Sequence, residues 1–281
     1  MNAQDSGSGW FESLDSGDVG AAVGVIRDGS GTEPREWAQE AIDNGAVPDE
    51  STYYNWLHEA TLAAAREETT ERELADDQQL IHAIRSLDDC ERVTNELTER
   101  LAEWAGTHDA DATVDTDFIR ELAAMETDNA VKEQMSRFAS RVVALDEETQ
   151  ELREFVERRT PDVAPNLATL AGPELAARLI SLAGGIEDLA KKPSGTVQVL
   201  GAEESLFAHL GGSAPSPKHG VIYLHEAVRD TPPANRGSAA RALAGKLSIA
   251  ARIDHYSGEY RPSLEAELDD RIERIRARDA E

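Results

Sequence analysis

The chain has 281 residues, 40% of them hydrophobic, so it can bury at least one sizeable core and is not expected to be disordered throughout. Its net charge of −27, from 55 acidic and 28 basic residues, argues against nucleic-acid binding by the surface as a whole, because such a surface repels phosphates. A single cysteine, Cys90, excludes an intrachain disulfide framework and a cysteine zinc cluster.

The same composition indicates where the protein works. No apolar run is long enough to span a membrane, and residues 1–9 lack the basic and apolar regions of a signal peptide. We therefore expect a cytoplasmic protein without a membrane partner. Because the acidic surface is poor in lysine, we interpret it as adaptation to concentrated salt, as in a halophilic organism.

The first predicted module, residues 1–70, is short. Its apolar run 19–26 fits either one strand or a half-buried turn. Residues 34–45 predict a short helix, with proline early and glycine after the last apolar residue. A second helix is predicted to begin near Ser51, with Asp49 and Glu50 at its positive end.

The second predicted module, residues 71–160, is a long antiparallel helical hairpin. From about Thr70 an apolar stripe recurs every three or four residues as far as Trp104. After an interruption at 106–117 and a short helical piece at 118–125, a heptad seam broken only at Thr149 forms the second arm, which Pro161 and Pro165 are predicted to end. We expect this seam to support a homodimer through Val131, Met135, Phe138, Val142, Leu145 and Leu152, with Ile81 and Phe155 as flanking apolar contacts.

The third predicted module, residues 161–281, is compact and all-helical. Proline and glycine punctuation separates four helical patterns, at 173–183, 201–210, 239–256 and 263–278. The one plausible extended run, 221–224, is too short to found a sheet. The fold class is therefore mainly α.

Basic residues are unevenly distributed along the chain. Residues 1–160 contain 38 acidic and 14 basic residues, whereas residues 191–261 contain 6 acidic and 9 basic ones. Four of the five lysines fall in this second window: Lys191, Lys192, Lys218 and Lys246. The window is therefore the part of the chain that we expect to meet a negatively charged partner.

Three sequence blocks lie in that window in a fixed order, at 201–207 (GAEESLF), 217–225 (PKHGVIYLH) and 236–254 (RGSAARALAGKLSIAARID). With the long hairpin and the entry Ala164-Pro165-Asn166-Leu167, they resemble the Nop-domain family, particularly the archaeal proteins of box C/D guide ribonucleoproteins. The resemblance covers residues 72–278 and is most specific from Pro165 to Tyr260.

The resemblance implies a non-catalytic scaffold without cofactor or metal, which directs 2′-O-methylation of ribosomal and transfer RNA. The third module would grip box C/D guide RNA together with a kink-turn-binding ribosomal-type protein, and the hairpin would self-associate. The shortened first module would either recruit the methyltransferase fibrillarin through its helices around residues 37–42 and 53–62, which we favour, or recruit it more weakly.

The expected contacts suit an RNA whose sugar-phosphate backbone is recognised by its shape. A helix opening at Gly201 and Ala202 would direct unpaired N–H groups at a phosphate. The loop at 217–220 adds a point charge, a ring and a tight glycine. We expect the RNA-binding residues to be Gly201, Ala202, Glu203, Lys218, His219, Gly220, His225, Arg236, Arg241 and Lys246.

Two positions depart from the family pattern. Glu204 and Ser238 stand where relatives carry lysine, which puts phosphate contact at Glu204 in doubt. His225, Arg241 and Lys246 also have an ordinary structural reading, as a satisfied half-buried histidine and as solvated cations on a helix.

Other classes of function fit less well. The chain has no paired-histidine metal motif, no nucleophile turn and no glycine-rich nucleotide loop after a strand, so neither a hydrolase nor a methyltransferase is expected. The alternative is an acidic coiled-coil adaptor that binds only proteins, which gives no reason for the clustering of the lysines.

Overall fold

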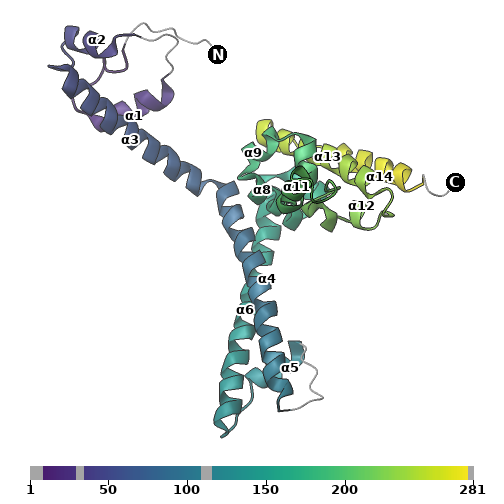
Figure 1. Cartoon of the computed structure of the whole chain (residues 1–281). Coiled ribbons are helices and arrows are strands. Elements are labelled where there is room, and N and C mark those ends of the chain that lie inside the picture. The colour runs from purple at the N-terminus through teal and green to yellow at the C-terminus, as the bar shows by residue number, and fades with distance from the viewer. Residues whose placement is uncertain (1–8, 30–34, 109–115, 278–281) are drawn as a thin grey trace. The chain divides into compact units, whose positions relative to one another are not determined.

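Helices form every regular element in the part of the chain that the structure describes. The structure is a computed structural model that describes residues 9–29, 35–108 and 116–277, and within these ranges it contains no strand. The predicted mainly helical class is thereby confirmed. The chain divides into two compact units, Met1–Ala75 and Asp76–Glu281 (Figure 1).

The N-terminal unit contains α1 (Val19–Asp28), α2 (Trp37–Asp43) and α3 (Glu50–Leu74). Neither a strand nor a turn forms at 19–26: Asp18 instead accepts a hydrogen bond from the Ala21 N–H and caps a helix. Asp49 caps α3 in the same way, accepting from the Thr52 N–H at 2.7 Å. The apolar run was ambiguous because a short run has no clear period.

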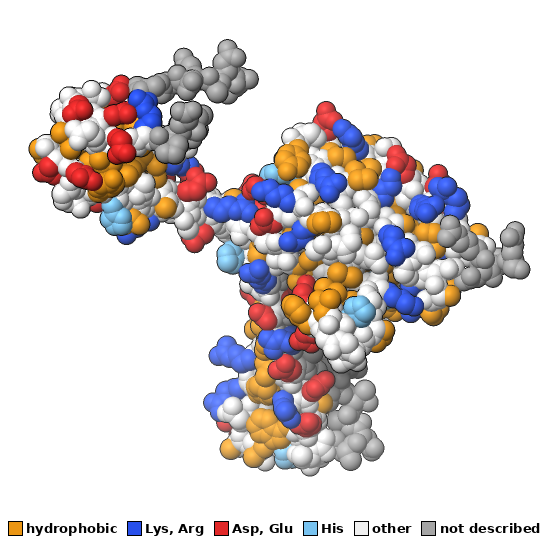
Figure 2. Space-filling model, turned by 45° about the horizontal axis from the view of Figure 1, so that its top comes forward, with side chains coloured by type: hydrophobic (Ala, Val, Ile, Leu, Met, Phe, Trp, Pro, Cys, Tyr) orange, Lys and Arg blue, Asp and Glu red, His pale blue; other side chains and the backbone are white. Residues whose placement is uncertain are grey.

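An aromatic cluster forms the core of this unit. Trp10 lies 4.8 Å from Trp56 between ring centroids, and its indole N–H donates to the Tyr53 hydroxyl at 3.1 Å. Phe11 and Tyr53 are buried beside them. Large rings bury much apolar area per residue, so a short module can form a core from few side chains. Acidic side chains cover much of the visible surface of this unit (Figure 2).

The predicted hairpin consists of α4 (Asp76–Gly106) and α6 (Ala130–Val163), which lie side by side in antiparallel directions, with the short α5 (Thr116–Ala123) against α6 (Figure 1). At ~1.5 Å per residue the 31 residues of α4 extend about 46 Å. Asn129 caps α6 by accepting from the Val131 and Lys132 N–H groups. The stripe predicted from Thr70 onward is interrupted at Ala75, where α3 ends.

The heptad seam of α6 faces the other helices of the same chain. Met135 and Val142 are buried with Leu101 and Leu122 in a core cluster at the far end of the hairpin. Thr149, the break in the seam, is also buried, and its hydroxyl donates to the Leu145 carbonyl at 2.7 Å. A buried threonine fits here because its hydroxyl finds a partner within its own helix.

Two expectations about the hairpin are wrong. Pro161 does not end the second arm, because α6 continues to Val163 and ends before Pro165. Ile81 is not available to a partner, because it is only 3% exposed and lies in the main core, against which the half-buried Phe155 also packs.

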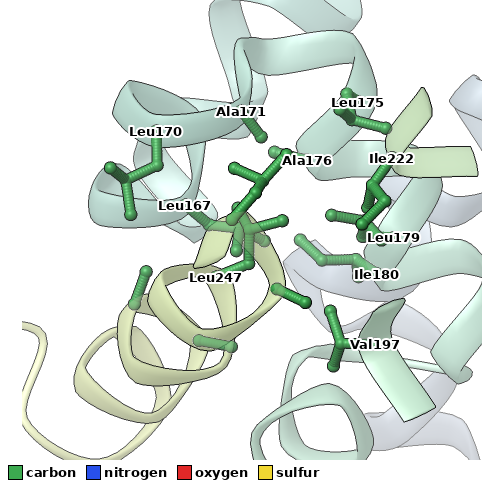
Figure 3. Packing of buried hydrophobic residues seen from close by; sticks show 14 of the residues in the cluster. Leu167, Leu170, Ala171, Leu175, Ala176, Leu179, Ile180, Val197, Ile222 and Leu247 are labelled. Atoms are coloured by element: carbon green, nitrogen blue, oxygen red, sulfur yellow. The ribbon is translucent and has the colours of Figure 1, made fainter. Parts of the chain in front are cut away.

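The rest of the second unit is a compact helical body. Its helices are α7 (Pro165–Ala171), α8 (Pro173–Ala183), α9 (Ile186–Lys191), α10 (Ser194–Val199), α11 (Glu203–Leu210), η1 (Val221–Leu224), α12 (Glu226–Arg229), α13 (Arg236–Tyr256) and α14 (Ser263–Arg276). The run 221–224, predicted as extended, is a 3-10 helix. Its buried Ile222 enters the main core, where Leu179, Ile180 and Leu247 meet it from α8 and α13 (Figure 3).

One buried polar contact joins the first helix of this body to α13. The Asp254 carboxylate accepts from the backbone N–H groups of Asn166 and Leu167, at 3.0 and 2.9 Å, and from the Asn166 side chain. Asn166 in turn donates to the Glu259 carbonyl and accepts from the Arg261 N–H. Asp254 thus satisfies the first turn of α7, where helix N–H groups have no partner within the helix.

An ion-pair network joins the hairpin to the helical body. Arg178 of α8 lies 2.7 Å from Asp88 of α4 and 3.3 Å from Glu174. Arg153 of α6 pairs with Glu174 and with Glu91 of α4. Because the two arginines share these acidic partners, the network fixes three helices relative to one another.

Candidate nucleic-acid interface

The second sequence block is joined through its backbone to residues 198–200, which directly precede the first block. The Gly220 N–H donates to the Gln198 carbonyl at 2.9 Å, and the Val221 N–H donates to the Leu200 carbonyl at 2.7 Å. The Gln198 side chain returns a hydrogen bond to the Lys218 carbonyl at 2.7 Å. The loop at 217–220 is therefore held against the end of α10.

Gly220 is the residue that permits this close approach. A Cβ at this position would lie 1.9 Å from the Leu200 carbonyl oxygen and 2.7 Å from the Leu200 carbonyl carbon. Gly201 follows Leu200 on the other side of this contact. Its φ is +79°, a value that residues with a Cβ rarely adopt. Both glycines are therefore required by the local backbone.

The second and third blocks meet around one aromatic ring. The His219 ring stacks on Tyr223 with centroids 4.7 Å apart, and the Arg236 guanidinium lies 5.4 Å from the Tyr223 centroid. Gly237, at the start of α13, lies against the Lys218 side chain, since a Cβ there would be 3.8 Å from it. We name Lys218, His219, Tyr223 and Arg236 the stacked cluster.

Hydrogen bonds fix the orientation of the Arg236 guanidinium. Its Nε donates to the Thr231 carbonyl at 3.0 Å and its Nη2 donates to the Arg229 carbonyl at 3.2 Å. Because these carbonyls carry no net charge, the positive charge of Arg236 is oriented without being neutralised. An arginine held in this way is preorganised to receive an anion.

The stacked cluster keeps His219 neutral at neutral pH. Burial lowers the pKa of His219 below its ordinary 6.5, and the positive charges of Arg236 and Lys218 act in the same direction. A phosphate placed beside the ring would act in the opposite direction. The neutral ring can meanwhile stack on a base or exchange hydrogen bonds with a ribose hydroxyl.

The opening of α11 differs from the prediction. The helix begins at Glu203, two residues after the expected start. The Gly201 N–H donates to the Glu203 carboxylate at 2.9 Å, and the Ala202 N–H donates to the Val199 carbonyl at 3.0 Å. Both N–H groups that were expected to face a phosphate are therefore occupied, and the first turn of α11 carries the acidic side chains of Glu203 and Glu204.

His225 has an internal role. Its Nδ1 accepts from the Ala227 N–H at 3.0 Å, which caps α12, and its Nε2 donates to the Leu170 carbonyl at 2.9 Å. Burial lowers its pKa, which maintains the neutral form that this arrangement needs. The structural reading of His225 fits these contacts, and both ring nitrogens are used within the chain.

Arg241 and Lys246 lie apart from the stacked cluster. Both line a groove between α13 and α14, and Lys246 pairs there with Glu267. The ten predicted RNA-binding residues thus separate into the loop and cluster around Gly220, the acidic opening of α11, the capping residue His225 and the α13–α14 groove.

Sequence reasoning missed three residues of this region. Tyr223 is the ring on which the cluster is built, but it was interpreted only as part of an extended run. Asn166 and Asp254 hold α7 against α13, although both stood in the quoted motifs. A short polar residue beside an apolar run can indicate a buried helix cap. These two residues are 88 positions apart, however, so that they pair with each other can be seen only in the folded structure.

Two exposed leucines line a hollow beside the stacked cluster. The hollow measures about 710 Å³, and its lining combines Leu182, Tyr223 and Leu224 with the charged side chains of Arg85, Asp88 and Arg178. Leu182 and Leu224 are 44% and 53% exposed. On α11, Phe207 and Leu210 are exposed as well. Large exposed apolar side chains beside a hollow are typical of a protein-binding site.

Some other kinds of site are not supported. Within residues 9–29, 35–108 and 116–277, no group of three or more His, Cys, Asp or Glu side chains is placed to hold a metal ion. No helix in these same ranges is both long and apolar enough to cross a membrane.

Comparisons with known proteins identify a family. A family model described as "Nop: snoRNA binding domain, fibrillarin" matches residues 71–275. An uncharacterized NOP5 family protein of Methanocaldococcus jannaschii is 48% identical over 140 residues, which cover 50% of this chain and 34% of that protein. Nucleolar protein 56 of Caenorhabditis elegans is 36% identical over 188 residues, which cover 65% of this chain and 38% of that protein. The matches thus span little more than a third of these relatives.

A solved structure resembles more of the chain. A chain in the crystal structure of a fibrillarin/Nop5p complex matches with a TM-score of 0.54 and 26% sequence identity. The match covers 91% of this chain and 92% of that one. The likeness therefore extends over the N-terminal unit, which lies largely outside the match to the family model.

Proposed function

The chain belongs to the Nop family of snoRNA-binding domains, and we propose that it is a non-catalytic scaffold of a box C/D ribonucleoprotein. It would bind guide RNA together with a kink-turn-binding ribosomal-type protein and recruit fibrillarin, which supplies the 2′-O-methylation of ribosomal and transfer RNA. Its single cysteine fits work in the reducing cytoplasm. The high acidity fits a halophilic archaeon.

The stacked cluster is the observation that carries this proposal. Lys218 provides a point charge, His219 a stacking ring and Arg236 an oriented fork, all within one small surface formed from separate parts of the sequence. Such a combination suits a sugar-phosphate backbone whose shape is recognised. It also fits a chain that otherwise repels phosphates, because Lys218 and Arg236 bring two positive charges to one place.

The hollow beside the cluster is where we place the kink-turn-binding protein. Exposed Leu182 and Leu224 offer apolar contacts within reach of RNA held at Tyr223. A protein seated there would contact both this chain and the RNA. The scaffold would then bind RNA strongly only when that protein is present.

The N-terminal unit is the proposed fibrillarin-binding part. Tyr54, His58 and Leu62 lie four residues apart on α3 and are exposed, which places one partly apolar stripe on the outside of this unit. The likeness to a chain from a fibrillarin complex extends over the same unit. We expect α2 and α3 to form the docking surface.

The hairpin is proposed to pair with a second copy. Met135 and Val142 are buried in the internal core of the hairpin, so they would support the dimer only by keeping the hairpin surface in shape. Val131 is 44% exposed, and Phe138, Leu145 and Leu152 are half-buried, so these four offer apolar area at the rim of the seam.

The test is RNA binding in molar KCl, measured by fluorescence anisotropy with a box C/D kink-turn RNA, with and without the kink-turn-binding protein. We expect binding to require that protein, and the Lys218→Ala/His219→Ala variant to weaken it at least tenfold, since each lost charge-assisted or ring contact is worth about 1 kcal/mol or more.

The matched control removes a lysine and a histidine elsewhere. Lys132 and His82 are exposed on the hairpin, so Lys132→Ala/His82→Ala should leave the affinity unchanged. A wild-type chain that binds no RNA under any of these conditions would favour the protein-only adaptor instead.

A further inference from the structure

A groove between α13 and α14 forms a second basic surface. It has a volume of about 500 Å³, and its lining includes Arg241, Gly245, Lys246, Arg271 and Arg274. Figure 2 shows several lysine and arginine side chains on the visible face of the larger unit, with acidic side chains among them. The sequence reasoning assigned no role to Arg271 or Arg274.

The shape of the groove is fixed by the core beneath it. Leu264, Leu268, Ile272 and Ile275 bury one face of α14. Arg271 and Arg274 lie on the exposed flank beside that face, three residues apart and side by side, where they line the groove. The Nε of Arg274 donates to the Asp270 carbonyl at 2.9 Å, which restrains the direction of its side chain.

The charges of the groove are only partly compensated. Lys246 pairs with Glu267, whereas in the part of the chain that the structure describes Arg241, Arg271 and Arg274 form no ion pair. Asp270 is the other acidic residue of the lining. Three arginines around one groove without an ion-pair partner among the described residues are unusual in a chain with 55 acidic residues, because acidic side chains attract arginine.

The lining of the groove suits a sugar-phosphate backbone. Arginine forks bind phosphate oxygens with two hydrogen bonds each. Between them, Ala242 and Ile249 provide an apolar floor for ribose, and Gly245 leaves open space, since a Cβ there would meet nothing within 4 Å. An acidic peptide would meet the same arginines but has no comparable use for this floor.

The groove is separate from the stacked cluster. Nine residues separate Arg236 from Gly245, which corresponds to about 13 Å along α13 and to a rotation that brings Gly245 to the face opposite Arg236. One short segment of RNA therefore does not fill both. We propose that the α13–α14 groove is a second RNA-backbone site, which holds another stretch of the guide RNA that the stacked cluster binds; this inference rests on the proposed function.

The test compares the salt dependence of RNA binding. Affinities of the full chain with the kink-turn-binding protein are measured over a series of KCl concentrations for the wild type and for Arg271→Gln/Arg274→Gln. The slope of log affinity against log salt is negative, and each lost phosphate contact reduces its magnitude by about 0.7–0.9. We expect the magnitude of the slope to fall by about 1.5 in this variant.

Two further variants separate the groove from general charge. Arg100→Gln/Arg137→Gln removes two exposed arginines from the hairpin and should leave the slope unchanged. Gly245→Leu adds bulk to the groove without changing charge and should weaken binding several-fold. Thermal unfolding of each variant checks that the fold is retained.

The outcomes distinguish the groove from the function on which it rests. RNA binding by the wild type with no change of slope in Arg271→Gln/Arg274→Gln would overturn the groove and leave the proposed function intact. No RNA binding by the wild type would overturn both. A poly-glutamate peptide that binds the wild type but not this variant, while RNA affinity stays equal, would assign the groove to an acidic protein instead.

Discussion

Replacing Gly220 by alanine should break the contact that holds the loop at 217–220 against residues 198–200. The added Cβ would lie 1.9 Å from the Leu200 carbonyl oxygen, so the two backbones must separate by about 1 Å before the contact becomes tolerable. That movement would stretch both backbone hydrogen bonds of this contact, from Gly220 to Gln198 and from Val221 to Leu200, beyond hydrogen-bonding distance.

The expected loss can be worked from these bonds. Each of the two hydrogen bonds contributes about 1 kcal/mol, and leaving its groups unsatisfied adds about as much again, so the variant should lose about 4 kcal/mol. For a unit of this size that corresponds to a fall in Tm of roughly 8–16 °C. RNA affinity should fall as well, because Lys218 and His219 move with the loop.

The matched control is Gly195→Ala in α10. A Cβ at Gly195 meets nothing within 4 Å, and alanine is favoured over glycine in a helix by about 0.5–1 kcal/mol, so this variant should be equal to the wild type or slightly more stable. The assay is thermal unfolding followed by RNA binding for both variants. A Gly220→Ala protein with the Tm and RNA affinity of the wild type would refute the reasoning.

Three other predictions concern stability. Asp254→Ala should lower the free energy of unfolding in urea by about 3 kcal/mol because it orphans two N–H groups of α7, whereas Glu259→Ala, which keeps the backbone carbonyl used by Asn166, should change little. Burial lowers the pKa of His225 from 6.5, so below about pH 6.5 the unfolded state binds more protons than the folded state. The Tm of the wild type should therefore fall as the pH drops below that value. His225→Ala should be less stable than the wild type at pH 8, but its Tm should fall less steeply with decreasing pH. Arg178→Ala should cost about 1–3 kcal/mol by urea unfolding because it leaves Asp88 and Glu174 without a shared partner, and an equal effect of Arg92→Ala, an exposed pair on α4, would contradict that.

Periodicity predicted the long elements well. The stripe of α4 and the seam of α6 each repeat over many turns, so their helical period was clear and the hairpin is confirmed. Short runs were less clear: 19–26 is a helix and 221–224 is a 3-10 helix, and neither is long enough to display a period. Pro161 misled because a helix can continue for a few residues beyond a proline in its last turn.

The candidate site was predictable in composition but not in arrangement. The concentration of basic residues marked the window in which Lys218, His219 and Arg236 meet in the structure. The stack on Tyr223 could not be read from the sequence, because it depends on the 3-10 turn and on the approach of Gly220 to Leu200. The roles of Asp254 and His225 depend on contacts across 55 residues or more.

The most direct test of the account is to map where RNA touches the chain. The full protein, assembled with a box C/D kink-turn RNA and the kink-turn-binding protein, is cross-linked by ultraviolet light, and the peptides that carry nucleotides are identified by mass spectrometry. We predict cross-links at His219 and Tyr223, the stacked rings of the cluster. Cross-links confined to the hairpin or the N-terminal unit would contradict the placement of the RNA site.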